Sequence, residues 1–264
     1  MSGERIGVLG VGRMGAPIGR HLLAAGRNVS VYDPSDEARS ALVAAGATEG
    51  ASAADVASRS DVVLVIVVDD EQVREAVAAC FESAGTLVAI CSSVRPDTCR
   101  ELAHEGAKRG VDVIDAALVR GERGAEEGQL VFYCGGPEAA VDRLRSAVAP
   151  VAEAVVHVGD VGAGQVAKTA NNILLWACIR ADVEALRLGR ALGVDLAKLR
   201  EALAIGSGAN RPLAEWGKHR LRWPHKDLEV ALAVAQDAGV ELPFVSHLPG
   251  LMRELNVDDL NELL

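Results

Sequence analysis

Aromatic residues and long hydrophobic runs are both scarce in this sequence. Aromatic side chains make up 3% of its 264 residues, although hydrophobic residues make up 50%. The core must therefore be built from Ala, Val, Leu and Ile, which is typical of helices packed on a parallel sheet. The most apolar run, from Val62 to Val68, is far shorter than the roughly 18 residues that span a bilayer. We therefore expect no membrane partner.

Positive charge is also in short supply, since the formal net charge is −10. A nucleic-acid-binding protein needs a basic face, so we expect no nucleic-acid partner. An anionic small-molecule substrate is still compatible with this composition, because a local pocket can be positive on an acidic protein.

The cysteines lack the spacing of a metal site or a disulfide framework. None of them forms a CxxC pair, and their number is odd; they are Cys80, Cys91, Cys99, Cys134 and Cys178. We predict no metal and no disulfide, and interpret them as buried thiols of a reduced cytoplasm. The N-terminus passes into a short strand and then reaches Arg13, which is not a signal-peptide pattern. We therefore expect a cytoplasmic location.

Strand and helix patterns alternate in the first part of the chain. Strands are predicted at 5–9, 28–32, 62–68, 87–90 and 111–114, with helical patterns between them. This alternation predicts right-handed crossovers and therefore an α/β fold with a doubly wound, Rossmann-type sheet.

Strand signals stop after about residue 160. The proline-free run from Gln165 to Leu192 predicts one helix about 42 Å long, and Gly193 is a suitable end for it. Helical patterns recur near 195–204, 224–238 and 243–255. We therefore predict a dinucleotide-binding domain at 1–161 and an all-helical domain at 162–264, joined by the long helix.

A glycine-rich turn follows the first predicted strand. The residues are Gly10, Gly12 and Gly15 in a GxGxxG pattern, with Arg13 and Met14 inside it. Such a pattern alone is weak, but here a strand precedes it, a helix follows, and an acidic residue ends the next strand. The first glycine permits the tight turn, the second lets the backbone approach a pyrophosphate, and the third lets helix and strand pack closely. The turn predicts a dinucleotide site at a helix N-terminus.

Asp33 ends the second predicted strand. Its carboxylate can accept hydrogen bonds from the adenosine ribose, and it would repel a 2′-phosphate. We therefore predict NAD as the favoured cofactor, with NADP as the alternative. Asp33 can also be a turn residue before Pro34, without any role in binding.

With these residues in view, the chain resembles the β-hydroxyacid dehydrogenase family, of the 3-hydroxyisobutyrate dehydrogenase and tartronate semialdehyde reductase type. The resemblance runs through GVLGVGRMGAPIGRHLLAAG, CSSVRPDT, DAALVRGERGAEEGQLVFYCGGPE, GAGQVAKTANN and HKDLEVAL, in the family's order and roughly its spacing. It implies an oxidoreductase that transfers a hydride between a nicotinamide cofactor and a small, anionic hydroxy acid or its aldehyde or keto acid. It also implies a homodimer or homotetramer that pairs through the helical half.

Lys168 and Asn172 lie in GAGQVAKTANN, four residues apart, so both project from one face of the predicted long helix. The resemblance implies that the lysine is the catalytic acid/base and that the asparagine holds it or the substrate. An ammonium group can stabilise negative charge on a carbonyl oxygen and donate the proton. The alternative is that Lys168 is an ordinary exposed lysine on a helix.

The resemblance implies further contacts to the cofactor. Val67 and Val68 match backbone positions that border it, Ser93 matches a hydroxyl position near the nicotinamide, and Lys226 matches a lysine brought over it from the helical half. The alternatives are a helix cap for Ser93 and a solvated side chain for Lys226.

The substrate loop departs from the family pattern. The family usually reads DAPVSGG, whereas this chain reads DAALVRG, so Val119 replaces the serine and Arg120 the first glycine, before Gly121. Arg120 can grip a carboxylate, sulfonate or phosphate through two hydrogen bonds. It can equally be structural and pair with Glu122 or Glu126.

Trp176 lies four residues beyond Asn172 and so follows it on the same helix face. A large apolar wall there would suit a substrate bulkier than a three-carbon acid. Alternatively, Trp176 belongs to the core or to an interface.

Two further functions are compatible with the same pattern. One is an imine reductase-like enzyme, and the other is a binding protein that senses NAD(H) without turnover. Lys168 weighs against both, because related imine reductases usually lack this lysine and a sensor needs no proton donor.

Overall fold

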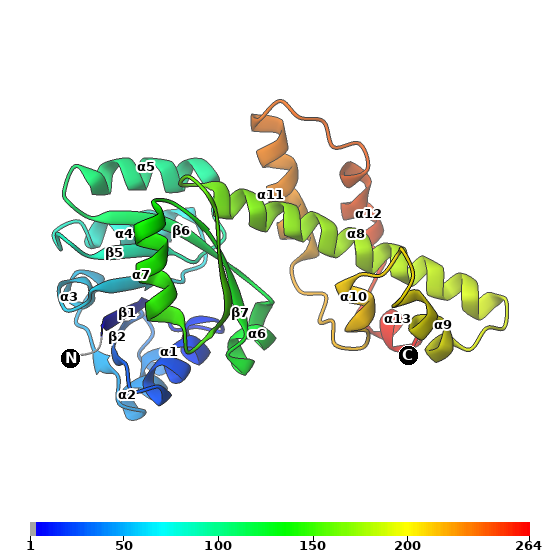
Figure 1. Cartoon of the computed structure of the whole chain (residues 1–264), viewed down its shortest axis with the longest axis horizontal. Coiled ribbons are helices and arrows are strands. Elements are labelled where there is room, and N and C mark those ends of the chain that lie inside the picture. Colours follow the sequence, from blue (N-terminus) through cyan, green and yellow to red (C-terminus); the bar gives the residue numbers. More distant parts are fainter. Residues whose placement is uncertain (1–3) are drawn as a thin grey trace. The chain divides into compact units, whose positions relative to one another are not determined.

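The computed structural model describes residues 4–264, which form two compact units that meet between Lys168 and Thr169 (Figure 1). Helix α8 (Ala163–Ala191) continues through this boundary. The domain boundary predicted between residues 161 and 162 falls directly before α8.

Within the described residues, the first unit contains an eight-stranded sheet in the order β3-β2-β1-β4-β5-β6-β7-β8. Every neighbouring pair is parallel except β6 and β7. The prediction of a doubly wound sheet is confirmed. The strands are β1 (Arg5–Leu9), β2 (Asn28–Tyr32), β3 (Thr48–Glu49), β4 (Val62–Val65), β5 (Leu87–Ile90), β6 (Asp112–Val119), β7 (Leu130–Gly135) and β8 (Ala152–Gly159).

Helices cover both faces of this sheet and form one hydrophobic core on each (Figure 1). Side chains of a strand alternate between the faces, so Leu64 enters one core while Val63 and Val65 enter the other. One face is covered by α1 (Gly15–Ala24), α2 (Asp36–Ala44), α6 (Gly121–Glu127) and α7 (Glu138–Val148). The other is covered by α3 (Ala53–Ser58), α4 (Asp70–Ala79) and α5 (Pro96–Ala107).

The carboxyl ends of the central strands lie in register across the sheet. One row of paired residues runs through Tyr32, Leu9, Val65, Ile90 and Asp115. The first four are the last residues of their strands, so the loops after them emerge side by side. Ligands of open parallel sheets bind at this edge, which places the candidate site there.

The regular elements of the second unit, over its described residues, are all helices, as predicted. Its core forms around the apolar face of α8, where Ile179, Val183 and Leu186 are buried. The predicted helix near 243–255 is in fact a short 3₁₀ turn followed by α12, and α10 and α13 were not predicted. The elements after α8 are α9 (Leu196–Leu203), α10 (Arg211–Ala214), α11 (Pro224–Asp237), η1 (Val245–His247), α12 (Leu248–Arg253) and α13 (Val257–Asn261).

Two predicted strands have different bounds in the structure. The strand predicted at 62–68 ends at Val65, because the Val67 amide donates to the Ser92 hydroxyl at 2.8 Å instead of joining the ladder. The strand predicted at 111–114 runs from Asp112 to Val119 and pairs antiparallel with β7.

The cysteines of the structure are free thiols. All are buried except Cys178, which is half-buried, so the expectation of buried thiols holds for the others. Burial raises the pKa of Cys80 and of Cys134 to about 12, so these thiols are protonated and unreactive near neutral pH. Among residues 4–264, no helix is long and apolar enough to cross a membrane.

Candidate active site

The glycine-rich turn connects β1 to α1, and its glycines have different surroundings. Gly10 has φ +89°, which L side chains rarely adopt. A Cβ on Gly15 would overlap the carbonyl oxygen of Gly10, so only glycine lets α1 approach the turn this closely. A Cβ on Gly12, in contrast, would meet no atom within 4 Å. The fold therefore does not require glycine at position 12, whereas the close approach of a ligand would.

The start of α1 can accept an anion. Within the described part of the chain, the amides of Gly12, Arg13 and Met14 donate to no protein acceptor. Such amides at a helix N-terminus, together with the helix dipole, form an anion-binding site. The turn therefore fits the pyrophosphate of a dinucleotide.

Asp33 follows β2 and contacts the glycine-rich turn directly. Its carboxylate accepts a hydrogen bond from the Val11 amide at 2.9 Å and from the Ser35 amide at 2.9 Å. Asp33 thus has the turn role that the sequence left open, through the Ser35 amide, and it also contacts the glycine-rich turn through the Val11 amide. A contact between Asp33 and a ribose stays a prediction.

Arg39 lies beside Asp33 and was missed by sequence reasoning. Its guanidinium donates to the Asp33 carbonyl, to the Asp36 carboxylate and, at 2.8 Å, to Glu49. It also lies over the Tyr32 ring, 5.9 Å from the ring centre, and its side chain is 13% exposed. This cation is therefore already neutralised by acidic neighbours.

Two loops at the carboxyl edge are joined through Ser92. Its hydroxyl accepts from the Val67 amide and donates to the Val67 carbonyl, both at 2.8 Å. The Val68 amide donates to the Gln72 side chain at 3.1 Å, and Val68 is exposed. Ser93, the predicted contact, is the exposed neighbour of buried Ser92. The structure brings the predicted Val67 and Ser93 to adjacent loops, with Ser92 as the link that the sequence did not reveal.

Asp115 and Gln165 attach the start of α8 to this edge. The Asp115 carboxylate is fully buried and accepts from the Gly162 amide at 2.5 Å and the Gln165 amide at 2.9 Å. The Gln165 side chain donates to the Ser92 carbonyl at 2.8 Å and accepts from the Val94 amide at 3.3 Å. The Gly-Ala-Gly lead-in was visible in the sequence, but its buried partner was not.

Lys168 and Asn172 both lie on α8, as predicted. Lys168 is half-buried, three residues after Gln165, whereas Asn172 is 5% exposed and accepts from the Asn171 amide side chain at 3.3 Å. The shared helix is established; the catalytic role of the pair stays a prediction.

The substrate loop has an unusual backbone. Val119 ends β6, and the next two residues both have positive φ, +83° at Arg120 and +61° at Gly121. A non-glycine residue rarely adopts this conformation, so glycine would suit the position of Arg120 better.

Arg120 forms an ion pair with Glu153 of β8, and its side chain is only 14% exposed. This favours the structural role left open by the sequence, but with a partner that the sequence did not predict. The carboxylate of Glu122, one of the two predicted partners, lies 3.7 Å from the guanidinium of Arg13 in the glycine-rich turn. Glu153 was overlooked because it is distant in sequence and approaches only through the β7–β8 pairing.

The two predicted residues of the second unit have different environments. Trp176 is 5% exposed within the core, and its indole N–H donates to the Asp227 carboxylate at 3.0 Å. The core alternative for Trp176 is therefore favoured over a substrate wall. Lys226, the neighbour of Asp227 on α11, is exposed.

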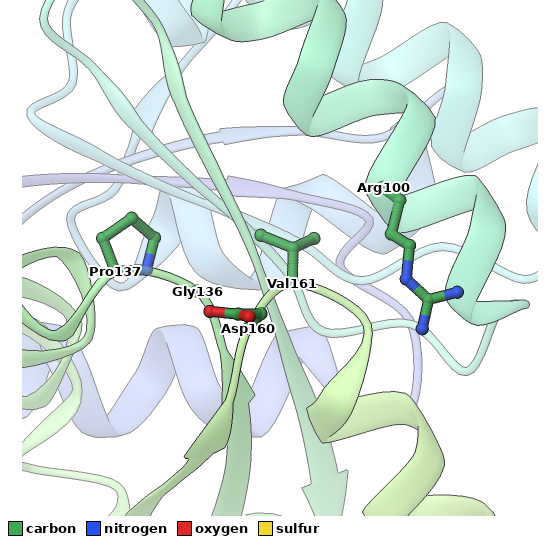
Figure 2. Close-up of a pocket in the computed structure, with 5 residues that line it drawn as sticks. All are labelled: Arg100, Gly136, Pro137, Asp160 and Val161. Carbon is green, nitrogen blue, oxygen red and sulfur yellow. The ribbon is translucent and has the colours of Figure 1, made fainter.

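A pocket of about 600 Å³ opens beside the start of α8, and none of the predicted site residues lines it. Figure 2 shows Arg100 and Pro137 on opposite sides of it, with Asp160 and Val161 between them. Because its lining includes no residue of the glycine-rich turn or of the loop after β2, we do not assign the dinucleotide to it. Among residues 4–264, no cluster of His, Cys, Asp or Glu could hold a metal ion.

Family models match nearly the whole described chain. Residues 5–159 match the NAD binding domain of 6-phosphogluconate dehydrogenase. Residues 162–262 match the NAD-binding domain of NADP-dependent 3-hydroxyisobutyrate dehydrogenase.

Individual proteins agree with these models. The chain is 34% identical to 3-hydroxyisobutyrate dehydrogenase of Pseudomonas aeruginosa over 260 residues, which cover 90% of this chain and 87% of that protein. It is 30% identical to 2-hydroxy-3-oxopropionate reductase of Escherichia coli, over 90% of this chain and 87% of the reductase. The solved structure of Mycobacterium tuberculosis 3-hydroxyisobutyrate dehydrogenase with L-serine superimposes with a TM-score of 0.89 at 26% identity, covering 98% of this chain and 99% of that one. The chain therefore belongs to the β-hydroxyacid dehydrogenase family of NAD(P)-dependent oxidoreductases.

Proposed function

We propose that this enzyme interconverts a small anionic hydroxy acid and its aldehyde or keto acid, with Lys168 as the general acid/base. The observation that carries the proposal is the attachment of the Lys168 helix to the carboxyl edge of the sheet, through Asp115 and Gln165. The same edge carries the glycine-rich turn and the Ser92 loop.

The chemistry follows from this placement. NAD(H), held at the glycine-rich turn, would accept or supply the hydride when bound. The Lys168 ammonium stabilises the negative charge that develops on the carbonyl oxygen and donates its proton to that oxygen during reduction. In the oxidative direction the neutral lysine takes the proton from the hydroxyl group. Asn172, four residues further along α8, is proposed to orient the lysine or the substrate.

We propose NAD as the preferred cofactor. The Asp33 carboxylate would repel a 2′-phosphate, and the neighbouring cation, Arg39, is engaged by Asp36 and Glu49. Gly12, Arg13, Val67, Ser93 and Lys226 are proposed as further contacts to the cofactor.

The proposed substrate is a short hydroxy acid. The names of two relatives, 3-hydroxyisobutyrate dehydrogenase and 2-hydroxy-3-oxopropionate reductase, both describe such acids. Val119 and Gly121 are proposed to border the substrate, without the hydroxyl group that the family loop usually supplies. Arg120 is proposed to stabilise this loop through Glu153, since its ion pair already satisfies the charge.

We propose a homodimer or homotetramer in the cytoplasm. Leu174, Leu188 and Leu192 are 65%, 62% and 72% exposed along and just after α8, and a second copy of the chain would cover such exposed apolar side chains. The free thiols suit a reducing compartment. Light scattering should give a mass well above that of the 27.5 kDa monomer.

A substrate panel tests the activity. The enzyme is offered 3-hydroxyisobutyrate, L-serine, 2-hydroxy-3-oxopropionate and a cyclic imine with NAD(H) and NADP(H), and the absorbance of the reduced cofactor is followed. Turnover that falls sharply in Lys168→Ala supports the proposal. Tight NAD binding without any turnover would favour a sensor, and turnover of a cyclic imine instead would favour an imine reductase; either result would contradict it.

A further inference from the structure

A carboxylate is buried within the row of residues that marks the carboxyl edge of the sheet. Asp115 lies in β6, paired with Ile90 on one side and Gly135 on the other, and its exposed fraction is 0%. An ionised group in this place is costly unless it is fully hydrogen-bonded. The hydrogen-bond donors to Asp115 therefore indicate its structural role.

The partners of Asp115 are backbone amides at the N-terminus of α8, one from Gly162 just before the helix and one from Gln165 in its first turn. One carboxylate oxygen accepts from Gly162 at 2.5 Å and the other from Gln165 at 2.9 Å. These amides have no partners within a helix, and the helix dipole favours negative charge beside them. Burial raises the pKa of Asp115, while the hydrogen bonds from these amides oppose that shift. Asp115 thus fixes where α8 begins.

The backbone around the Asp115 carboxylate is closely packed. A Cβ on Gly164 would lie 2.7 Å from one Asp115 oxygen, and a Cβ on Gly135 would lie 2.6 Å from the other. Both glycines let backbone reach the carboxylate directly. The start of α8 is therefore held against β6 and β7 and cannot shift without breaking these contacts.

Gln165 sets the rotation of the same helix. Its side chain is 2% exposed and spans the loop after β5, bonding the Ser92 carbonyl at 2.8 Å and the Val94 amide at 3.3 Å. Ser92 in turn bonds both backbone groups of Val67. The chain of bonds thus connects α8 to the two loops that border the proposed nicotinamide site.

We infer that Asp115 and Gln165 are positioning residues that act through Lys168, a role that rests on the proposed function of that lysine. Lys168 lies three residues after Gln165, so both project from neighbouring positions of one helical turn. Fixing the start and rotation of α8 fixes the direction of the Cα–Cβ bond of Lys168, and therefore the space that its amine can reach. Neither residue contacts the reacting atoms in this assignment.

Gln165→Leu is the principal test, because it removes both side-chain hydrogen bonds while filling a similar volume. Misplacing a catalytic group by about 1 Å costs about 10²-fold in rate. We expect kcat on 3-hydroxyisobutyrate, or on the panel acid that reacts fastest, to fall about 10²-fold, while the Kd of NAD changes little. Gln165→Glu keeps the acceptor for Val94 but turns a carboxylate towards the Ser92 carbonyl, so it should lower kcat as well.

Asp115→Asn supplies a second test, with Asp160→Asn as its control. Asp160 is a second aspartate near the start of α8. It is exposed, and no hydrogen bond to its side chain is seen among the described residues. The control should keep normal kcat, whereas Asp115→Asn should lose activity and melt at a lower temperature. If Asp115→Asn does not fold, the two Gln165 variants still decide the matter.

A double-mutant cycle separates this inference from the proposed function. In a Lys168→Ala background, Gln165→Leu should not lower kcat any further. The limb of the kcat–pH profile that disappears in Lys168→Ala should shift in the Gln165→Leu single variant. Equal losses from Gln165→Leu in both backgrounds, or normal kcat in Gln165→Leu, would overturn the inference. Normal kcat in Lys168→Ala would instead overturn the proposed role of the lysine.

Discussion

Replacing Gly12 or Gly15 with alanine should separate cofactor binding from folding. The two glycines are three residues apart in the same turn, yet their surroundings differ. An added Cβ at Gly12 meets nothing within 4 Å, whereas at Gly15 it overlaps the Gly10 carbonyl oxygen and lies 3.0 Å from the Gly10 carbonyl carbon. The obstacle at Gly15 is backbone, which cannot rotate away as a side chain would.

The magnitudes follow from these surroundings. Gly15→Ala forces α1 away from β1, and overpacking of this kind costs about 1–3 kcal/mol. Because 1 kcal/mol shifts the melting temperature of a chain of this size by about 2–4 °C, the midpoint should fall by about 2–12 °C. Gly12 has no positive φ, so Gly12→Ala should leave the apoprotein unchanged or more stable by about 0.4–1 kcal/mol.

The affinity for the cofactor, in contrast to the stability of the fold, should fall in Gly12→Ala. In Gly12→Ala the methyl group occupies the space through which a pyrophosphate approaches the backbone. Loss of one hydrogen bond to a charged group costs about 1.5–3 kcal/mol, which raises the Kd of NAD roughly 10- to 150-fold. Thermal melting without cofactor and calorimetric titration with NAD measure the two effects separately. A Gly12→Ala protein that binds NAD normally would refute the assignment of this turn to the pyrophosphate.

Three further substitutions test the other parts of the site. Lys168→Ala should lower kcat about 10²- to 10⁴-fold with little change in the Kd of NAD, as measured by steady-state kinetics and titration. Asp33→Ser should raise kcat/KM with NADP relative to NAD, and an unchanged ratio would contradict the role of the carboxylate. Arg120→Gly should leave the free energy of unfolding unchanged or raise it by up to about 2 kcal/mol, because it relieves about 1–2 kcal/mol of backbone strain while losing an ion pair with Glu153 worth about 1 kcal/mol or less. A strong rise in KM in Arg120→Gly would restore Arg120 as a substrate anchor.

Local patterns in the sequence predicted the elements that local physics determines. The glycine-rich turn was predictable because three glycines at this spacing, between a strand and a helix, are typical of a dinucleotide-binding turn. Helix α8 was predictable because its long run contains no proline and ends at glycine. The end of β4 was not, since Val67 leaves the ladder for a side chain 25 residues away, on Ser92.

The missed contacts of Asp115 and Arg120 are distant in sequence. Gly162 and Gln165 bond to Asp115 across 47 and 50 residues, and Arg120 finds Glu153 only because β7 and β8 bring the strands together. Spacing rules reach about one helical turn or one strand pair, so they could suggest Glu122 and Glu126 for Arg120 but not Glu153. The strained backbone at Arg120 was likewise invisible until the fold was known.

The strand row explains how the candidate site is assembled. After Leu9, Tyr32, Val65 and Ile90 the chain leaves the sheet at once, and each departure supplies a loop of the proposed cofactor site. Strand β6 differs because it continues for four residues beyond its row position, to Val119, and carries the substrate loop further out. The loop after β6 therefore does not cover Asp115, the charged member of the row. The start of α8 packs there instead, with the Gly162 and Gln165 amides bonded to the Asp115 carboxylate. The helix that carries Lys168 thus begins against the strand that also delivers the proposed substrate loop.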